Sequence, residues 1–181
     1  MRLLSLIALS ALAATPAIAQ ETRQLDSHEH GVGQLDIAID GTQVALELHA
    51  PGADIVGFEY SAESTEDLAK IEAALLVLAQ PLDLFVLPEA TQCEVVEAHV
   101  ELEGGDDHEG EDGHADDAVH TQFHAEYLLN CEDVASLSEI SFAYFTAFPN
   151  ALEVEVQVVS DAGATAFEVE RDAPLINLSE Q

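Results

Sequence analysis

Alternating apolar and polar positions near the start of the chain predict a β-hairpin. Leu35, Ile37 and Ile39 are apolar and are separated by mostly polar residues. Asp40-Gly41 is a turn signal, and residues 44–48 then alternate in the same way. Side chains alternate between the two faces of a strand. A loop of two or of four residues therefore puts the apolar residues of both strands on one face.

Apolar residues at helical spacing predict two helices. The first opens with the capping sequence at residues 64–67 and ends before Pro81. Its apolar stripe is predicted to be core and consists of Leu68, Ile71, Leu75 and Leu78. The second helix is predicted over residues 134–148, before Pro149. Its inward positions are predicted to be Leu137, Ile140, Tyr144 and Phe148.

Five further segments alternate as strands do and complete the predicted fold. They are residues 84–87, 93–101, 119–131 and 152–158 and the segment after Ala162-Gly163. Without the short segment 84–87, the order is β-β-α-β-β-α-β-β. It predicts an α+β domain in which an antiparallel β-sheet is covered by two helices.

The first 19 residues are predicted to be a signal peptide. Arg2 supplies a charged start, and the apolar run at residues 3–14 is too short to span a bilayer with ease. Ala17-Ile18-Ala19 has the small-x-small pattern that signal peptidase accepts. We expect cleavage after Ala19, which leaves residues 20–181 as one exported domain with no membrane insertion. A retained membrane anchor is the alternative.

The charge of the chain restricts its partners. It has 36 Asp and Glu against 4 Lys and Arg, a formal net charge of −32. Such a surface repels the phosphates of nucleic acids and of anionic membranes, so neither is expected as a partner. It attracts cations, although charge alone does not distinguish metal handling from a solubilising surface.

Two cysteines, Cys93 and Cys131, are present. In an oxidising compartment a lone pair usually forms a disulfide. The bridge would close a loop of about 39 residues, which chain-entropy models value at roughly 4 kcal/mol. Thiolate ligation of a metal is the alternative, and no C-x-x-C spacing supports it.

Histidines near the hairpin have spacing suited to a metal. His28 and His30 would share one face of an extended strand, about 6.6 Å apart, which is chelating distance for two imidazoles. That face is opposite to the one holding Leu35. By hairpin parity, His49 lies on the same face as His28 and His30. With a two-residue loop His49 would lie opposite Val32 and diagonal to His30, roughly 7–8 Å away.

His124 and Glu126 are also two apart and share the polar face of a predicted strand. His120 lies on that face too, but about 13 Å from His124, too far to share one ion. We therefore group His124 with the sheet site and His120 with the loop before it. His99 is interpreted as an ordinary exposed histidine.

Residues 102–118 contain almost only Gly, Asp, Glu and His and predict a disordered acidic loop. His108, His114 and His120 could form an auxiliary metal site there. It would bind more weakly than a preformed site, because ordering a loop costs entropy. A solvated acidic insertion with incidental histidines is the alternative.

Several segments, taken in their order along the chain, resemble the ZrgA-like family of periplasmic zinc-binding proteins: HEHGVGQLDIAIDG, LELHAPGADIVGFE, HTQFHAEYLLNC, FTAFP and LEVEVQVVSDAG. The resemblance covers nearly all of the exported chain. It implies a periplasmic protein that works beside a zinc uptake system, with components of an importer as partners. By motif, His28 and His30 match the family's HxHG opening, Glu59 its GFE segment, and His124 and Glu126 its His-x-acid segment. The chain departs from the family at Tyr60, where a histidine is frequent, and its acidic loop has fewer histidines.

Together these features predict a zinc-binding protein and not an enzyme. The predicted ligands are His28, His30, Glu59, His124, Glu126 and His49. An iron or zinc enzyme on the same ligands is one alternative, although the HTQFH segment lacks the glutamate of the H-E-x-x-H motif. A metal-free acidic interaction protein is another. Imidazole also suits copper and nickel, so the residues leave the native metal open.

Overall fold

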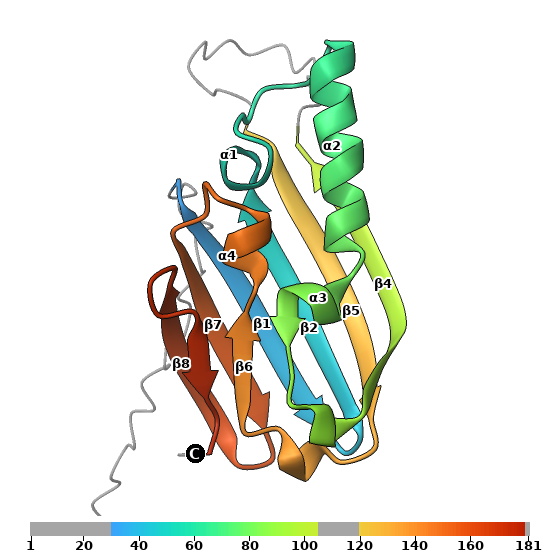
Figure 1. The fold of residues 1–181 in the computed structure, drawn as a ribbon, viewed down its shortest axis with the longest axis vertical. Coiled ribbons are helices and arrows are strands. Elements are labelled where there is room, and N and C mark those ends of the chain that lie inside the picture. Colours follow the sequence, from blue (N-terminus) through green and yellow to red (C-terminus); the bar gives the residue numbers. More distant parts are fainter. Residues whose placement is uncertain (1–29, 105–119, 180–181) are drawn as a thin grey trace, which may run out of the picture.

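The computed structural model describes residues 30–104 and 120–179, and its main layer is a six-stranded β-sheet (Figure 1). The strand order is β4-β5-β2-β1-β7-β8. The strands are β1 (Val32–Asp40), β2 (Gln43–Pro51), β4 (Cys93–Glu103), β5 (Gln122–Cys131), β7 (Glu153–Ser160) and β8 (Gly163–Glu170). β1 pairs with β7 in parallel, and the other neighbours are antiparallel. The predicted α+β class is confirmed, while the purely antiparallel sheet is wrong at this one pair.

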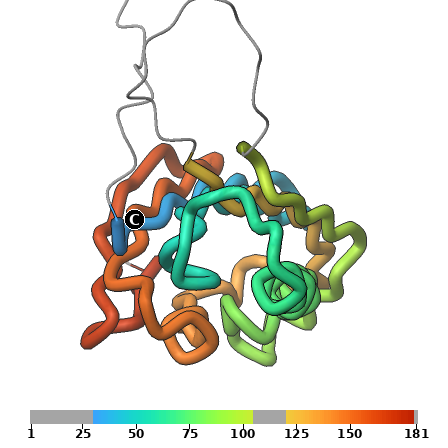
Figure 2. The backbone as a smooth tube through the Cα atoms, turned by 90° about the horizontal axis from the view of Figure 1, so that it is seen from above, coloured from blue at the N-terminus to red at the C-terminus, as the bar shows by residue number. Residues whose placement is uncertain are grey.

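A second layer of helices and a small sheet covers one face of the large sheet (Figures 1 and 2). The small sheet has the order β3-β6-β9. Its strands are β3 (Phe85–Val86), β6 (Glu139–Phe142) and β9 (Leu175–Asn177). The helices and 3-10 turns are α1 (Gly52–Ile55), α2 (Thr65–Leu78), α3 (Pro81–Leu84), η1 (Glu89–Thr91), η2 (Val134–Ser136) and α4 (Tyr144–Ala147). We call the opposite side of the large sheet its open face.

The hairpin of β1 and β2 forms as predicted, with a register two residues away from the predicted one. Asp40 pairs with Gln43, so the turn is Gly41-Thr42 and His49 lies opposite Gln34, not Val32. Gly41 has a φ of 59°, a conformation that favours glycine. A turn centred on Asp40-Gly41 would move Asp40 out of the ladder. In the observed turn, the residue with a positive φ is a glycine.

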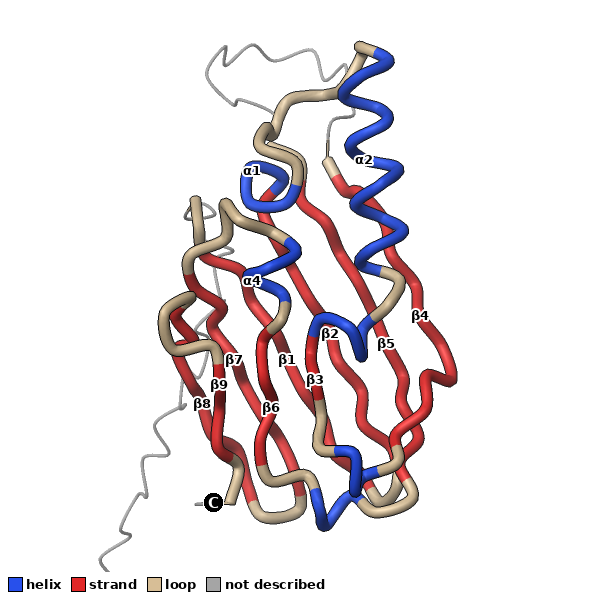
Figure 3. Tube along the Cα trace, viewed as in Figure 1, coloured by secondary structure: helices blue, strands red, loops and turns tan. Residues whose placement is uncertain are grey.

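The α2 helix starts and ends as predicted. The Ser64 hydroxyl oxygen accepts a hydrogen bond from the Asp67 N–H at 3.0 Å, which caps the first turn. Ala74 and Leu78 are buried, while Leu68 is half exposed. The predicted core stripe is therefore correct at its carboxyl end, where α2 packs over the sheet (Figure 3), and wrong at its first member.

The second predicted helix is wrong. Residues 134–148 form η2, β6 and the single-turn α4 instead (Figure 3). The Ser136 hydroxyl bonds the Asp133 carboxylate at 2.6 Å, a local contact that competes with helix formation. Ile140 and Phe142 then alternate with Ser141 and are buried, as in a strand. The apolar spacing of this segment fits both periods, and pairing with β3 and β9 decides in favour of the strand.

The core lies between the two layers and includes Phe85, Phe142, Tyr144, Phe145 and Phe148. The predicted disulfide is present: Cys93 and Cys131 face each other where β4 begins and β5 ends, with Cα atoms 3.9 Å apart. In the described residues, no helix is long and apolar enough to cross a membrane.

Candidate metal centre

Main-chain hydrogen bonds bring distant segments together where β2 ends and β5 begins. The Gly52 N–H donates to the Thr121 carbonyl at 2.8 Å, and the Thr121 N–H donates to the Glu59 carbonyl at 2.9 Å. A Cβ atom on Gly52 would lie 2.6 Å from the Phe58 carbonyl oxygen and from the Thr121 hydroxyl. Only glycine therefore permits this approach, which sets Glu59 beside the residue before Thr121.

That residue is His120, and it completes a group of three side chains that we call the rim cluster: His30, Glu59 and His120. His30 Nε2 lies 3.0 Å from Glu59 Oε2, and His120 Nδ1 lies 2.5 Å from the same oxygen. The Glu59 side chain is 10% exposed, whereas His30 and His120 are 65% and 51% exposed. One shielded carboxylate oxygen thus lies between two accessible imidazoles.

Two buried carboxylate oxygens at the rim cluster have no hydrogen-bond partner among the described residues. Glu59 Oε1 and Asp54 Oδ2 are buried without a hydrogen bond, while Asp54 Oδ1 accepts one from the Gly31 N–H at 2.8 Å. Burial raises the pKa of Asp54 to about 6. The Gly31 hydrogen bond opposes the rise, the charge of Glu59 adds to it, and His30 opposes it. A cation held by the rim cluster would offset the negative charge gathered here.

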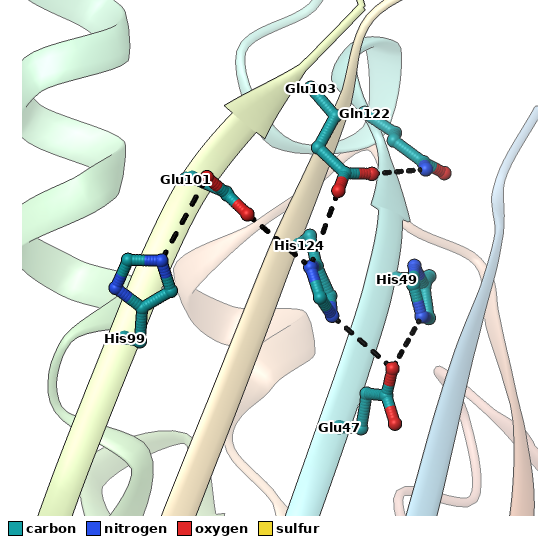
Figure 4. Close-up of polar contacts among 7 residues, drawn as sticks. All are labelled: Glu47, His49, His99, Glu101, Glu103, Gln122 and His124. Carbon is teal, nitrogen blue, oxygen red and sulfur yellow. Dashed lines mark hydrogen bonds and ion pairs between the residues drawn. The ribbon is translucent and has the colours of Figure 1, made fainter.

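A second group, which we call the sheet cluster, lies on the open face and consists of Glu47, His49 and His124 (Figure 4). His49 and His124 are opposite each other on β2 and β5. Their rings are stacked, with centroids 4.5 Å apart and planes at 8°. His49 Nε2 and His124 Nε2 lie 3.2 Å and 3.3 Å from Glu47 Oε1. Register and parity alone place these three groups together.

The other nitrogen of His124 faces carboxylates of β4 (Figure 4). His124 Nδ1 lies 3.4 Å from Glu103 Oε1 and 3.7 Å from Glu101 Oε1. Gln122 Nε2 donates to the second oxygen of Glu103 at 2.8 Å. His124 is therefore in contact with carboxylates through both ring nitrogens.

The structure groups the histidines differently from the sequence prediction. His120, predicted to belong with the acidic loop, lies with His30 and Glu59. His124, predicted to share the site of His30, lies with His49. The distance argument that separated His120 from His124 agrees with two clusters. His120 precedes β5 and lies beside the segment after α1, which brings it to Glu59.

Three carboxylates near His124 were missing from the predicted set: Glu47, Glu101 and Glu103. Glu47 could have been found by parity, since it is two residues before His49 on the same strand. Glu101 and Glu103 require the β4–β5 register, which the sequence does not give.

The remaining predicted residues lie apart from the clusters or outside the described residues. Glu126 is on the open face, opposite both Glu47 and His99, and belongs to neither cluster. His99 is exposed and lies 3.8 Å from Glu101. Leu102 and Glu103, predicted to begin the acidic loop, are the last residues of β4. His28, His108 and His114, the acidic loop from residue 105 onward and the signal peptide fall outside the described residues.

Comparison with known proteins adds one finding. The sequence model described as ZrgA family zinc uptake protein matches residues 27–178, which include every member of both clusters. No curated protein sequence matches the chain.

Proposed function

Because the chain belongs to the ZrgA family of zinc uptake proteins, we propose that it captures zinc in the periplasm and supports a zinc importer, holding the ion at the rim cluster. The observation that carries this proposal is the position of Glu59 Oε2 between His30 Nε2 and His120 Nδ1. Imidazole and carboxylate are ordinary zinc ligands. The ligands would thus be His30, Glu59 and His120.

Zinc would need a small outward movement of one imidazole. Bonds of 2.0–2.1 Å in tetrahedral geometry place ligand atoms about 3.4 Å apart. The His30–Glu59 separation of 3.0 Å is close to this value, whereas the His120–Glu59 separation of 2.5 Å is shorter. His120 is half exposed and precedes β5, so its ring has room to move away from Glu59.

Three ligands leave a fourth tetrahedral position. Water could occupy it, and so could His28, the predicted ligand two residues before His30. An open fourth position allows an incoming ligand to bind before the others leave, which suits transfer to a second protein. More than half of each histidine of the rim cluster is exposed. We therefore propose ion exchange and not catalysis, which requires a pocket that buries a substrate.

The acidic loop would serve capture. Its ends attach beside the rim cluster, since a Cβ atom on Gly104 would lie 2.4 Å from the carbonyl oxygen of His120. The sequence between them contributes carboxylates together with His108 and His114. A high local density of negative charge raises the local concentration of zinc near the rim.

A zinc titration of the metal-free exported chain against a competing chelator tests the proposal. Glu59→Gln keeps the shape of the side chain and removes its charge, so we expect a zinc affinity at the rim at least tenfold lower. Glu63→Gln is the matched control, because Glu63 is exposed and four residues away. An unchanged titration of Glu59→Gln would refute the assignment of the rim cluster.

A further inference from the structure

We propose that the sheet cluster is a second zinc site on the open face, with Glu47, His49 and His124 as ligands. It rests on the proposed function only for the identity of the ion. His120 and His124 are four residues apart, about 13 Å along an extended chain, so the two clusters cannot share one ion. The protein would therefore bind two zinc ions near the same end of the sheet.

Two of the three separations between ligand atoms of the sheet cluster are close to those that zinc requires. In a tetrahedral site the ligand atoms lie about 3.4 Å apart. His49 Nε2 and His124 Nε2 are 3.2 Å and 3.3 Å from Glu47 Oε1, and all three atoms lie within 4.8 Å of one another. The stacking of the rings directs both Nε2 atoms to one side, toward Glu47 (Figure 4). The two nearly parallel rings would have to tilt toward each other for both Nε2 lone pairs to point at one ion.

The carboxylates of β4 would fix His124 in the state that binds metal. Glu103 Oε1 lies 3.4 Å from His124 Nδ1, and Gln122 Nε2 donates to the other oxygen of Glu103. An imidazole that carries its proton on Nδ1 presents the lone pair of Nε2 to the metal. The His124 side chain is 14% exposed, so this orientation is held by its surroundings. Glu103 is thus a positioning residue for His124.

The charge of the open face independently favours a cation at Glu47. Glu47 lies opposite Glu126 on β5 and opposite Asp36 on β1. Like charges directly across a strand pair destabilise a sheet. The same residues border a hollow of about 560 Å³ that also contains Glu97 and His99. A divalent cation bound to Glu47 would reduce the repulsion among these carboxylates.

The test separates the two sites by variant. In the metal-free exported chain, zinc titration with a competing chelator should give two tight equivalents for the wild type. His49→Ala combined with His124→Ala should lose one of them, and His99→Ala, the matched histidine control on the open face, should lose none. His49→Gln combined with His124→Gln, checked by circular dichroism, guards against loss of folding.

Site-specific readout comes from the imidazole nitrogens in ¹⁵N NMR spectra. In Glu59→Gln, zinc should still shift the signals of His49 and His124 at one equivalent, even if the rim site has been lost. Glu103→Gln should lower the affinity of the sheet cluster about tenfold, the low end for a residue that orients a ligand. Rescue by Glu103→Asp would argue for orientation by charge.

The outcomes distinguish this inference from the proposed function. If the His49 and His124 signals do not move when zinc binds, or the double variant keeps both equivalents, the sheet cluster is not a site and the rim proposal stands. If Glu59→Gln loses nothing while the double variant loses all tight binding, the rim proposal fails and the sheet cluster remains.

Discussion

Asp54 is a buried carboxylic acid, with 2% of its surface exposed. One oxygen accepts the Gly31 hydrogen bond and the other has no partner. It also lies close enough to Glu59 for the charge of that residue to affect its titration. The residue thus connects the turn that carries His30 to the carboxylate of the rim cluster, at a cost in stability whenever it is ionised.

The pH dependence of that cost gives a prediction for Asp54→Asn. Burial raises the pKa of Asp54 from 3.8 to about 6, so the folded state holds its proton to higher pH than the unfolded chain. Its contribution to stability is therefore complete below pH 4 and is lost as the pH rises to 6. Two pKa units correspond to roughly 3 kcal/mol. Asparagine has no charge, so the variant should lack this loss and gain up to about 3 kcal/mol above pH 6.

Urea unfolding of the metal-free protein between pH 4 and pH 8 measures this difference. Asp161→Asn is a suitable control, since Asp161 is exposed in the turn before β8. If Asp54→Asn and the wild type differ by a constant amount across the whole range, Asp54 does not titrate as its burial requires.

At the scale of elements, the sequence predicts what depends on local periodicity. The hairpin faces, the α2 cap at Ser64 and the Cys93–Cys131 pair follow from alternation, capping chemistry and cysteine count. The helix predicted over residues 134–148 fails because its apolar spacing fits two periods and the partner strands β3 and β9 decide between them. Long-range pairing is not encoded in a local pattern.

The same limit explains the candidate site. His30, Glu59, His49 and His124 could be selected from the sequence by residue type, spacing and family resemblance. Their division into two clusters could not, because it depends on the approach of Gly52 to Thr121 and on the β2–β5 register. The two-residue error in the hairpin register also moved His49 toward His30 in the prediction.

The disulfide gives a prediction for the β4–β5 pair. Cys93 and Cys131 lie at the end of the pair away from Glu103 and Gln122. Replacing both cysteines by alanine should lower the free energy of unfolding by about 2–4 kcal/mol, because the open chain gains entropy when unfolded. Zinc stoichiometry should stay the same, since both clusters lie at the other end.

Urea unfolding and zinc titration of Cys93→Ala combined with Cys131→Ala check this. Reduction of the wild-type protein is the control and should give the same loss of stability. Loss of a zinc equivalent in the variant would mean that the register of β4 against β5 depends on the bridge.

At the scale of the whole molecule, the net charge of −32 would act on every step of the proposed zinc capture. The open face adds opposed carboxylate pairs such as Glu155 with Glu168 and Glu153 with Glu170. Such a field attracts divalent cations over distances limited by salt screening. In the proposed function the histidine clusters bind the ion, whereas the field sets how fast an ion reaches them.

This division of roles predicts the effect of shortening the acidic loop. Residues 105–117 hold seven of the 36 acidic residues, together with His108 and His114. Replacing them by two glycines keeps Glu103, which contacts His124. We expect zinc association, followed by stopped flow, to slow several-fold at low ionic strength and to approach the wild-type rate at high salt. Both tight equivalents should remain, because their predicted ligands come from strands and turns.

A variant of equal length with the two histidines replaced by serine separates charge from ligation. If it loses a tight equivalent while the wild type keeps two, the loop supplies a ligand and capture and binding are not separate functions.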